Sequence, residues 1–293
     1  MYSFFFLAFR QPVAAKMAFL RVKSMYPESP VYIYSDRGGI DLSGLCTGDP
    51  KCKFSESPVH NGHAFDSYKK RLRPEILERA KIFMTRFREA AEWGGCEYML
   101  YVEEDVWIEK PITADYVPVG DNGGIFNPWY PVFTWPLQEY IRLQTGQPME
   151  VKSVIYGASY YRTDALIDAM DNHWDKIDWM QINELDGRIP MCWDTIPPIL
   201  FVLSGYKAHY WNGACEKDRP YNREFAPLKC TDVPLTHKRH NPAHITYIHW
   251  RDEGTFNATM ERMGGRVMRD HTNDLCFQNM QANYSLPCPV RVE

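Results

Sequence analysis

One short segment limits the fold of this chain more than any other. Residues 98–102 form an uninterrupted apolar run, Tyr-Met-Leu-Tyr-Val, between Gly94-Gly95 and three consecutive carboxylates. An apolar run of this length, bounded by turn residues, is typical of a strand that is buried on both faces. Such strands belong to sheets that helices cover on both sides, so the segment predicts an α/β protein.

The chain before this segment alternates between strands and helices. Residues 2–9 and 31–34 are apolar and predict two more buried strands. Sequence order strand–helix–strand–helix–strand is typical of parallel strands joined by crossover helices. The sequence therefore predicts a Rossmann-like, mixed but mainly parallel sheet flanked by helices.

Two helices are expected between these strands. The first begins at Pro12 and extends to about residue 26, and the second spans 74–94 and ends at a glycine pair. The hydrophobic residues of segment 37–70 show no helical or strand periodicity, and we expect mostly loops there. The first helix is expected to bury Val13, Met17 and Leu20. The second is expected to bury Ile76, Ala80, Phe83, Phe87 and Ala91.

The second half of the chain has shorter and more mixed patterns. Residues 123–133 and 154–161 each predict a strand, and residues 163–177 predict a helix with Leu166 directed inward. A further helix is expected after Thr195, ending at Ser204-Gly205. Alternation over residues 244–250 predicts another strand.

Charge and hydropathy exclude two classes of protein. The chain has 33 Lys and Arg residues against 37 Asp and Glu residues, which gives a net charge of −4 without a basic block. We therefore expect no nucleic-acid partner, because such binding depends on neutralising phosphates. The apolar run at residues 4–9 is far shorter than the roughly 20 residues of a membrane span. It lacks the flanks of a signal peptide and predicts a core strand. The oligomeric state is left open.

The eight cysteines are scattered and form no CxxC pair. This pattern fits neither a disulfide framework nor a zinc site, and it favours reduced thiols and a cytoplasmic location. Cys46 and Cys52 are the one pair that we consider for a local disulfide. Two N-glycosylation sequons, at Asn257 and Asn283, keep a secretory route open.

The three carboxylates after residue 102 predict a cation site. Ligands bind at the carboxyl ends of strands in α/β sheets, and a divalent cation relieves repulsion between neighbouring carboxylates there. Their hard oxygen atoms suit Mn²⁺ or Mg²⁺. In an extended backbone Glu103 and Asp105 would project to one side and share the metal, and Glu104 would project to the other. The alternative is a solvated acidic turn.

Residues 98–106 resemble the hydrophobic strand and DxD motif of GT-A-fold glycosyltransferases. The resemblance implies a GT-A-like α/β fold and a UDP-sugar donor bound with Mn²⁺ or Mg²⁺. In this chain Glu103 stands at the first motif position, which gives a Glu-x-Asp variant. The resemblance implies that Asp105 is the firmer metal ligand, with Glu103 on the metal or the ribose and Glu104 also at the donor.

The resemblance extends along one domain over residues 1–293. It implies a nucleotide-sugar-binding half over 1–115 and an acceptor-binding half over 116–293. The segment Ala8-Phe9-Arg10 resembles the first nucleotide-contacting loop of the family, and Asp36 resembles its uracil- or ribose-contacting residue. His249 resembles the late histidine that many members return to the metal; the alternative is a histidine in the core or on the surface.

Asp194 is the candidate catalytic base. The family places an acidic residue at the start of a helix in the acceptor cleft, and Trp193-Asp194 resembles that position. An inverting transfer requires a carboxylate that removes the proton of the acceptor hydroxyl. The resemblance leaves a retaining transfer open, and Asp194 can instead be a helix cap before Thr195.

Aromatic and small residues of the second half are candidates for binding the acceptor sugar. Trp129, Tyr156 and Trp193 offer rings on which sugars stack, and Gly157 leaves room for a sugar; packing in the core is the alternative for the rings. The diphosphate requires a basic partner. Arg10 and Arg79 are the candidates that we favour among Arg10, Arg37, Arg71, Arg79 and Arg86.

The overall sequence also resembles glycosyltransferases of large algal (chlorella) viruses, which build capsid glycans and include a xylosyltransferase. This resemblance implies UDP-xylose as a candidate donor, a glycan acceptor and a location in the host cytoplasm. Two other functions stay open. A sugar nucleotidyltransferase is disfavoured because residues 9–12 lack the glycine-rich loop that holds a triphosphate. A non-catalytic carbohydrate-binding protein is also disfavoured, because it needs no acidic segment after a buried strand.

Overall fold

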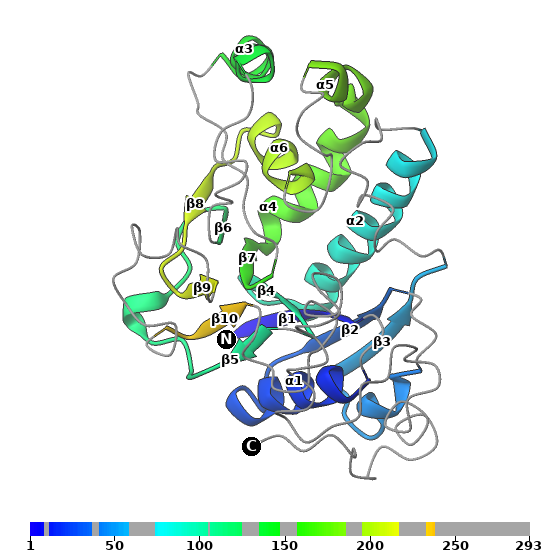
Figure 1. Ribbon diagram of the computed structural model, residues 1–293, viewed down its shortest axis with the longest axis vertical. Coiled ribbons are helices and arrows are strands. Elements are labelled where there is room, and N and C mark those ends of the chain that lie inside the picture. The colour runs from blue at the N-terminus through cyan, green and yellow to red at the C-terminus, as the bar shows by residue number, and fades with distance from the viewer. Residues whose placement is uncertain are drawn as a thin grey trace, which may run out of the picture.

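A computed structural model describes residues 1–8, 12–36, 41–58, 74–104, 106–124, 135–146, 157–185, 195–216 and 233–237. A central seven-stranded sheet has the order β3-β2-β1-β4-β7-β6-β8, and a three-stranded sheet has the order β5-β10-β9 (Figure 1). The strands of the central sheet are β1 (Tyr2–Ala8), β2 (Val31–Ser35), β3 (Cys52–Glu56), β4 (Tyr98–Glu103), β6 (Asn122–Gly124), β7 (Ser159–Arg162) and β8 (Ala208–Tyr210). Those of the small sheet are β5 (Val106–Ile108), β9 (Ala214–Glu216) and β10 (Leu235–His237).

All strands of the central sheet except β7 run in the same direction. β1 pairs in parallel with β2 and β4, and β2 pairs in parallel with β3. β7 is antiparallel to both of its neighbours, β4 and β6, whereas β6 and β8 are parallel to each other. The sheet is therefore mixed and mainly parallel, as the alternation of strands and helices predicts.

Helices cover both faces of the sheet (Figure 1). α1 packs on one face, and α2 packs on the other together with α4 and α6. The helices are α1 (Pro12–Met25), α2 (Pro74–Gly94), α3 (Trp135–Thr145), α4 (Thr163–Asp168), α5 (Trp179–Leu185) and α6 (Ile196–Leu203). Shorter helical turns span Ser43–Cys46, Ala114–Tyr116, Ala169–His173 and Trp174–Lys176. Among the described residues, no helix has both the length and the apolar composition of a membrane span.

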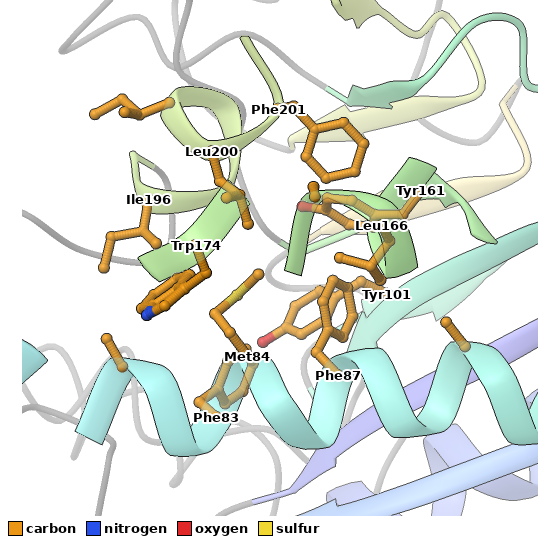
Figure 2. Close-up of a cluster of buried hydrophobic side chains, with 14 of the residues drawn as sticks. Phe83, Met84, Phe87, Tyr101, Tyr161, Leu166, Trp174, Ile196, Leu200 and Phe201 are labelled. Carbon is orange, nitrogen blue, oxygen red and sulfur yellow. The ribbon is translucent and has the colours of Figure 1, made fainter. Parts of the chain in front are cut away.

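The core between α2 and the sheet is rich in aromatic rings. Phe83 and Phe87 of α2 contact Phe5 of β1 with ring centroids 5.6 and 5.0 Å apart. Phe87 also contacts Tyr161 of β7 at 4.8 Å (Figure 2). The predicted stripe on α2 is confirmed at Ala80, Phe83, Phe87 and Ala91, all of which are fully buried. One core thus joins strands from both halves of the chain.

The predicted buried face of α1 is wrong at Leu20; Met17 is half-buried, and the side chain of Val13 lies outside the described residues. Leu20 is 51% exposed, and the residues that face the sheet are Ala15, Ala18, Phe19 and Val22. Both sets of positions have helical spacing, so the period alone does not decide between them. The alanines on the observed face leave space for β1 residues such as Phe6, whose ring lies 6.5 Å from that of Phe19.

The expectation of loops over residues 37–70 is wrong in part. Residues 43–46 form a short helical turn, and β3 (Cys52–Glu56) adds an edge strand next to β2. β3 has a mostly half-buried or exposed pattern with Lys53 and Glu56 exposed, so it lacks the apolar run that identifies the inner strands. A disulfide joins Cys46 to Cys52, with Cα atoms 4.9 Å apart. The one pair considered for a local disulfide is therefore bridged, whereas Cys96 is a free, buried thiol, as expected of the other cysteines.

The helix predicted over residues 163–177 is divided into three pieces. α4 continues into a π-helical turn over Ala169–His173 and a 3₁₀ turn over Trp174–Lys176. Leu166 is fully buried, as predicted. The helix after Thr195 is confirmed as α6, which ends at Leu203 with Ser204 as its C-cap. The strand predicted over residues 244–250 lies outside the described residues.

Tyr160 of β7 fixes the contact with β6. A Cβ on Gly123 would lie 2.5 Å from the Tyr160 ring, so only glycine fits there without a shift of the ring. The Tyr160 hydroxyl donates a hydrogen bond to the Val119 carbonyl. Burial raises the pKa of Tyr160, which keeps the hydroxyl protonated as a donor.

Candidate functional site

The candidate site lies at the edge of the central sheet where β1, β2, β3 and β4 end, which we call the carboxyl edge. The backbone N–H of Asp36 donates to the carbonyl of Ala8 at 2.8 Å, and that of Ser57 donates to the carbonyl of Ser35 at 2.8 Å. These bonds continue the parallel ladder one residue beyond the strands. Ala8 and Asp36, both predicted at the donor, therefore lie side by side at this edge.

Asp36 is a buried carboxylate, only 3% exposed. It follows the fully buried strand β2, so its position is fixed by the sheet. A carboxylate at such a position is stable only where hydrogen bonds or opposite charges compensate for lost water. Its location beside Ala8 at the end of a parallel strand is the place where α/β sheets bind ligands.

The acidic segment after β4 lies at the same edge. Glu103 is the last residue of β4 and pairs in register with Leu7 of β1. Its Oε1 atom accepts a hydrogen bond from the Tyr101 hydroxyl at 2.7 Å. Glu104 is more buried than Glu103, at 7% exposed. The alternative of a solvated acidic turn is wrong for Glu104, whose carboxylate is removed from bulk water.

The premise of an extended backbone through residue 105 is also wrong. β4 ends at Glu103, and the chain turns at Glu104 before β5 begins at Val106. β5 belongs to the small sheet, so the chain leaves the central sheet within this turn. Strict alternation of the three acidic side chains does not apply there, because alternation requires a continuous strand. Asp105 lies outside the described residues.

The reversed strand β7 brings its amino-terminal end to the carboxyl edge. Ser159 pairs with Tyr101, so Gly157 and Ala158 lie next to the end of β4. The strand predicted over residues 154–161 is wrong at Gly157 and Ala158, which form a turn. Ala158 has a φ of 62°, a left-handed conformation that a strand does not allow. Both residues are buried.

The amino terminus of α6 also lies on the side of the carboxyl edge. The ring of Phe83 contacts Tyr34, near the end of β2, whereas Trp93 contacts Tyr32, nearer its start. Phe83 therefore lies over the end of β2 that belongs to the carboxyl edge. Figure 2 shows Ile196, the first residue of α6, on the side of Phe83, whereas Phe201, further along α6, lies beside Tyr161. Thr195, which is fully buried, occupies the N-cap position of α6. Trp193 and Asp194 lie outside the described residues, so the alternative of Asp194 as a helix cap stays a prediction.

The two described arginine candidates for the diphosphate differ in their surroundings. Arg79 is exposed on α2. Arg86 forms an ion pair with Glu89, at 2.6 Å, on the same helix. Other predicted site residues lie outside the described part of the chain, namely Phe9, Arg10, Arg37, Arg71, Trp129, Tyr156 and His249.

The donor atoms present at the edge are chemically suited to Mn²⁺ or Mg²⁺. Glu103 and Glu104 supply carboxylate oxygens, which these cations prefer. Within the described residues, however, no three His, Cys, Asp or Glu side chains are grouped closely enough to hold a metal ion. Asp105 and His249, the other predicted ligands, lie outside those residues.

The contact between Tyr101 and Glu103 was not predicted from the sequence. A signal for it exists in the sequence, because residues two apart on a strand share a face. Tyr101 is buried among the rings that pack on α2, and its hydroxyl must then reach a polar partner. A tyrosine two positions before the acidic segment therefore predicts a hydrogen bond to its first carboxylate.

No protein-family model and no curated protein sequence matches the chain. Solved structures do resemble it. An active-site mutant of LgtC has a TM-score of 0.51 at 15% identity, over 92% of this chain and 98% of that one. The galactosyltransferase LgtC in complex with donor and acceptor sugar analogues has a TM-score of 0.48 at 14% identity, over 88% of this chain and 95% of that one. Mouse xyloside xylosyltransferase 1, in the apo form, has a TM-score of 0.43 at 12% identity, over 82% and 99%.

The alignment with the LgtC mutant covers nearly the whole of both chains and shows the fold. The chain has a mixed, mainly parallel sheet with flanking helices, in the arrangement of a glycosyltransferase. The GT-A-like fold class expected from the sequence is thereby confirmed.

Proposed function

We propose that this chain is a glycosyltransferase that moves a sugar from a UDP-sugar to a hydroxyl group of a glycan. The observation that supports this proposal most is that acidic residues and a turn of small residues lie together at one edge of the sheet. Three acidic residues, Asp36, Glu103 and Glu104, and the small turn Gly157-Ala158 lie at the carboxyl edge of a sheet with a glycosyltransferase fold. Acidic groups suit a nucleotide with its cation, and small residues suit a sugar.

In this proposal the ends of β1, β2 and β4 bind the donor. Asp36 accepts hydrogen bonds from uracil or ribose, because an ionised carboxylate is an acceptor only. Ala8, Phe9, Arg10 and Glu104 line the nucleotide site, and Arg79, exposed on α2, interacts with the diphosphate.

Mn²⁺ or Mg²⁺ would be held by Glu103, Asp105 and His249. When bound, the cation neutralises charge on the departing diphosphate. Glu103 is the described member of this set, and its Oε1 atom accepts a hydrogen bond from the Tyr101 hydroxyl. The hard oxygen donors of the two carboxylates match these ions better than they match zinc.

Asp194 is the proposed base of an inverting transfer. It removes the proton of the acceptor hydroxyl while that oxygen forms a bond to the anomeric carbon and the bond from that carbon to UDP breaks. Its neighbour Thr195 is buried at the start of α6, on the side of the carboxyl edge. A retaining transfer is the alternative, and it would not need Asp194 as a base.

Gly157, Trp129, Tyr156 and Trp193 are proposed to bind the acceptor. UDP-xylose is a candidate donor, because of the resemblance to glycosyltransferases of algal viruses that build capsid glycans. A viral role in the host cytoplasm belongs to the same proposal. The Cys46–Cys52 disulfide is unusual for a cytosolic protein. Whether the protein is found in a reducing or an oxidising compartment therefore tests the proposed location directly.

The test is a donor-hydrolysis screen with UDP- and GDP-sugars in the presence of Mn²⁺. We expect one UDP-sugar to be hydrolysed fastest and EDTA to abolish the reaction. Asp194→Asn should lower transfer to an acceptor by about 10²-fold or more, the usual contribution of a general base. Asp115→Asn, at an exposed position that is not one of the proposed site residues, is the matched control and should leave the rate unchanged.

Hydrolysis that persists in EDTA would contradict metal dependence. An unchanged transfer rate in Asp194→Asn would remove this residue from the chemistry and favour a retaining enzyme. Turnover of a nucleoside triphosphate with a sugar phosphate would instead identify a nucleotidyltransferase.

A further inference from the structure

We infer that Tyr101 is a positioning residue that sets the orientation of the Glu103 carboxylate at the donor site. The inference rests on the proposed function for the role of Glu103. The contact itself is independent of that role, because the Tyr101 hydroxyl donates to Glu103 Oε1 at 2.7 Å.

The two side chains meet because of their register on β4. Residues two apart on a strand project from the same face of a sheet. Tyr101 belongs to the core under α2, and Leu7, the register partner of Glu103, packs against the same core. Glu103 thus lies where this aromatic core meets the carboxyl edge.

The Tyr101 ring is held by its neighbours. It is fully buried and stacks on Phe5 at 5.8 Å with an interplanar angle of 17°. Phe87 contacts it edge-on at 5.8 Å and 80°. Figure 2 shows Tyr101 above α2, between Phe87 and Met84. A ring enclosed in this way has one orientation, so its hydroxyl occupies a fixed point near the end of β4.

Glu103 has a flexible side chain that this hydroxyl can orient. It is half-buried at the last position of β4, and a glutamate side chain has several rotatable bonds. A hydrogen bond from a fixed hydroxyl to an ionised carboxylate is short and strong, and it selects one rotamer. Groups that orient a ligating carboxylate typically change metal affinity by 10- to 100-fold when they are removed.

The experiment compares Tyr101→Phe with Tyr161→Phe. Both substitutions remove one hydroxyl from a fully buried ring in the same core. Tyr161 is the matched control because its hydroxyl accepts a hydrogen bond from the neutral side chain of Ser159, at 3.3 Å. Calorimetric titration with UDP and Mn²⁺ measures the affinity of each variant, alone and combined with Glu103→Gln.

We expect Tyr101→Phe to weaken UDP–Mn²⁺ binding about tenfold and Tyr161→Phe to change it less than twofold. In the Glu103→Gln background, Tyr101→Phe should cause little further loss, because the carboxylate that it orients is absent. Wild-type affinity in Tyr101→Phe would overturn the inference. A loss that adds in full to that of Glu103→Gln would overturn it as well.

A second readout separates this inference from the proposed function. Urea unfolding of wild type, Tyr101→Phe, Glu103→Gln and the double variant measures the coupling between the two side chains without any ligand. We expect a coupling of about tenfold in the unfolding equilibrium constant, as for a hydrogen bond to a charged group. If wild type binds no UDP, the proposed function fails, but the coupling still tests whether Tyr101 orients Glu103. Additive effects of the two substitutions on unfolding would overturn the inference.

Discussion

The two halves of the central sheet reach the carboxyl edge in opposite ways. In the first half, β3, β2, β1 and β4 run parallel, and all of them except β1, which ends at Ala8, end in acidic or polar residues at that edge. In the second half, β7 runs against its neighbours, and its beginning, Gly157-Ala158, lies at the same edge. Because β7 alone is reversed, small residues lie beside the carboxylates at the ends of the parallel strands.

The halves also differ in how their elements are fixed. The first half has long inner strands and the 21-residue helix α2. The second half has strands of three or four residues, short helices and a residue in the left-handed conformation. Precise placement there depends on contacts with the first half, such as that between Tyr161 and Phe87.

Phe87→Ala tests whether the halves form one folding unit. The ring contacts Phe5 and Tyr101 from the first half and Tyr161 from the second. Its removal should lower the free energy of unfolding by about 4 kcal/mol. Unfolding in urea, followed by tryptophan fluorescence and by far-UV circular dichroism, should show one common transition.

Phe19→Ala is the matched variant for this test, because it removes the same ring from the core under α1. It should shift the same single transition. Two transitions, of which Phe87→Ala moves only one, would contradict a shared core.

The Cys46–Cys52 disulfide lies in the first half, next to β3. The double change Cys46→Ser and Cys52→Ser should lower the free energy of unfolding by about 2 kcal/mol, since it opens a short loop in the unfolded chain. Urea unfolding without reductant measures this loss. Cys96→Ser removes a free buried thiol and is the control. Reaction of Cys46 and Cys52 with a thiol reagent in the native protein would show that the bridge is absent.

Ala158→Gly tests the left-handed turn of the second half. Replacing a buried alanine by glycine normally destabilises a protein, because glycine is more flexible in the unfolded chain, by about 1 kcal/mol in a helix, and because a buried methyl group of ~0.8 kcal/mol is lost. Ala158, however, has a φ of 62°, which glycine adopts without strain. The relief of this strain offsets most of the loss, so Ala158→Gly should change the free energy of unfolding by less than about 0.5 kcal/mol. Ala165→Gly, at a fully buried position in α4, is the control and should cost about 2 kcal/mol. Equal losses at the two positions would contradict the turn.

Acid titration compares one surface carboxylate from each half. The hydrogen bond from Lys23 lowers the pKa of Asp49, and those from Asn172 and Tyr206 lower the pKa of Asp168. A lowered pKa stabilises the folded state above the unfolded pKa of about 4, and that stability is lost as the pH falls through the folded pKa.

Asp49→Asn and Asp168→Asn should each lower stability at pH 7 by less than about 1 kcal/mol, because both carboxylates are partly exposed. The difference from wild type should vanish near pH 2, where the carboxylates are protonated. Unfolding measured at both pH values checks this, and a difference that persists at pH 2 would contradict the assignment to charge.

The sequence predicts the inner strands of the first half well. Their apolar runs, above all residues 98–102, are bounded by turn residues and are typical of strands that are buried on both faces. β3 escapes prediction because its alternating polar residues fit an edge strand or a loop equally. On α1, two sets of residues have the spacing of a buried face, and only packing against β1 selects Ala15 and Ala18 over Leu20.

The candidate site was predictable only at the level of topology. Acidic residues after a buried strand predict the edge at which Glu103 and Glu104 lie. The turn at Glu104 and the left-handed Ala158 depend on the change from one sheet to another and on the reversal of β7, which no local pattern signals. The metal-binding roles of Asp105 and His249 stay predictions.

Calorimetric titration of the protein with UDP, with and without Mn²⁺, tests the central claim most directly. We expect saturable binding that requires Mn²⁺ and that Asp105→Asn weakens at least tenfold, with Asp115→Asn as the unchanged control. Binding of a free glycan in the absence of nucleotide, with no heat from UDP and Mn²⁺, would contradict the claim that the carboxyl edge binds a nucleotide sugar.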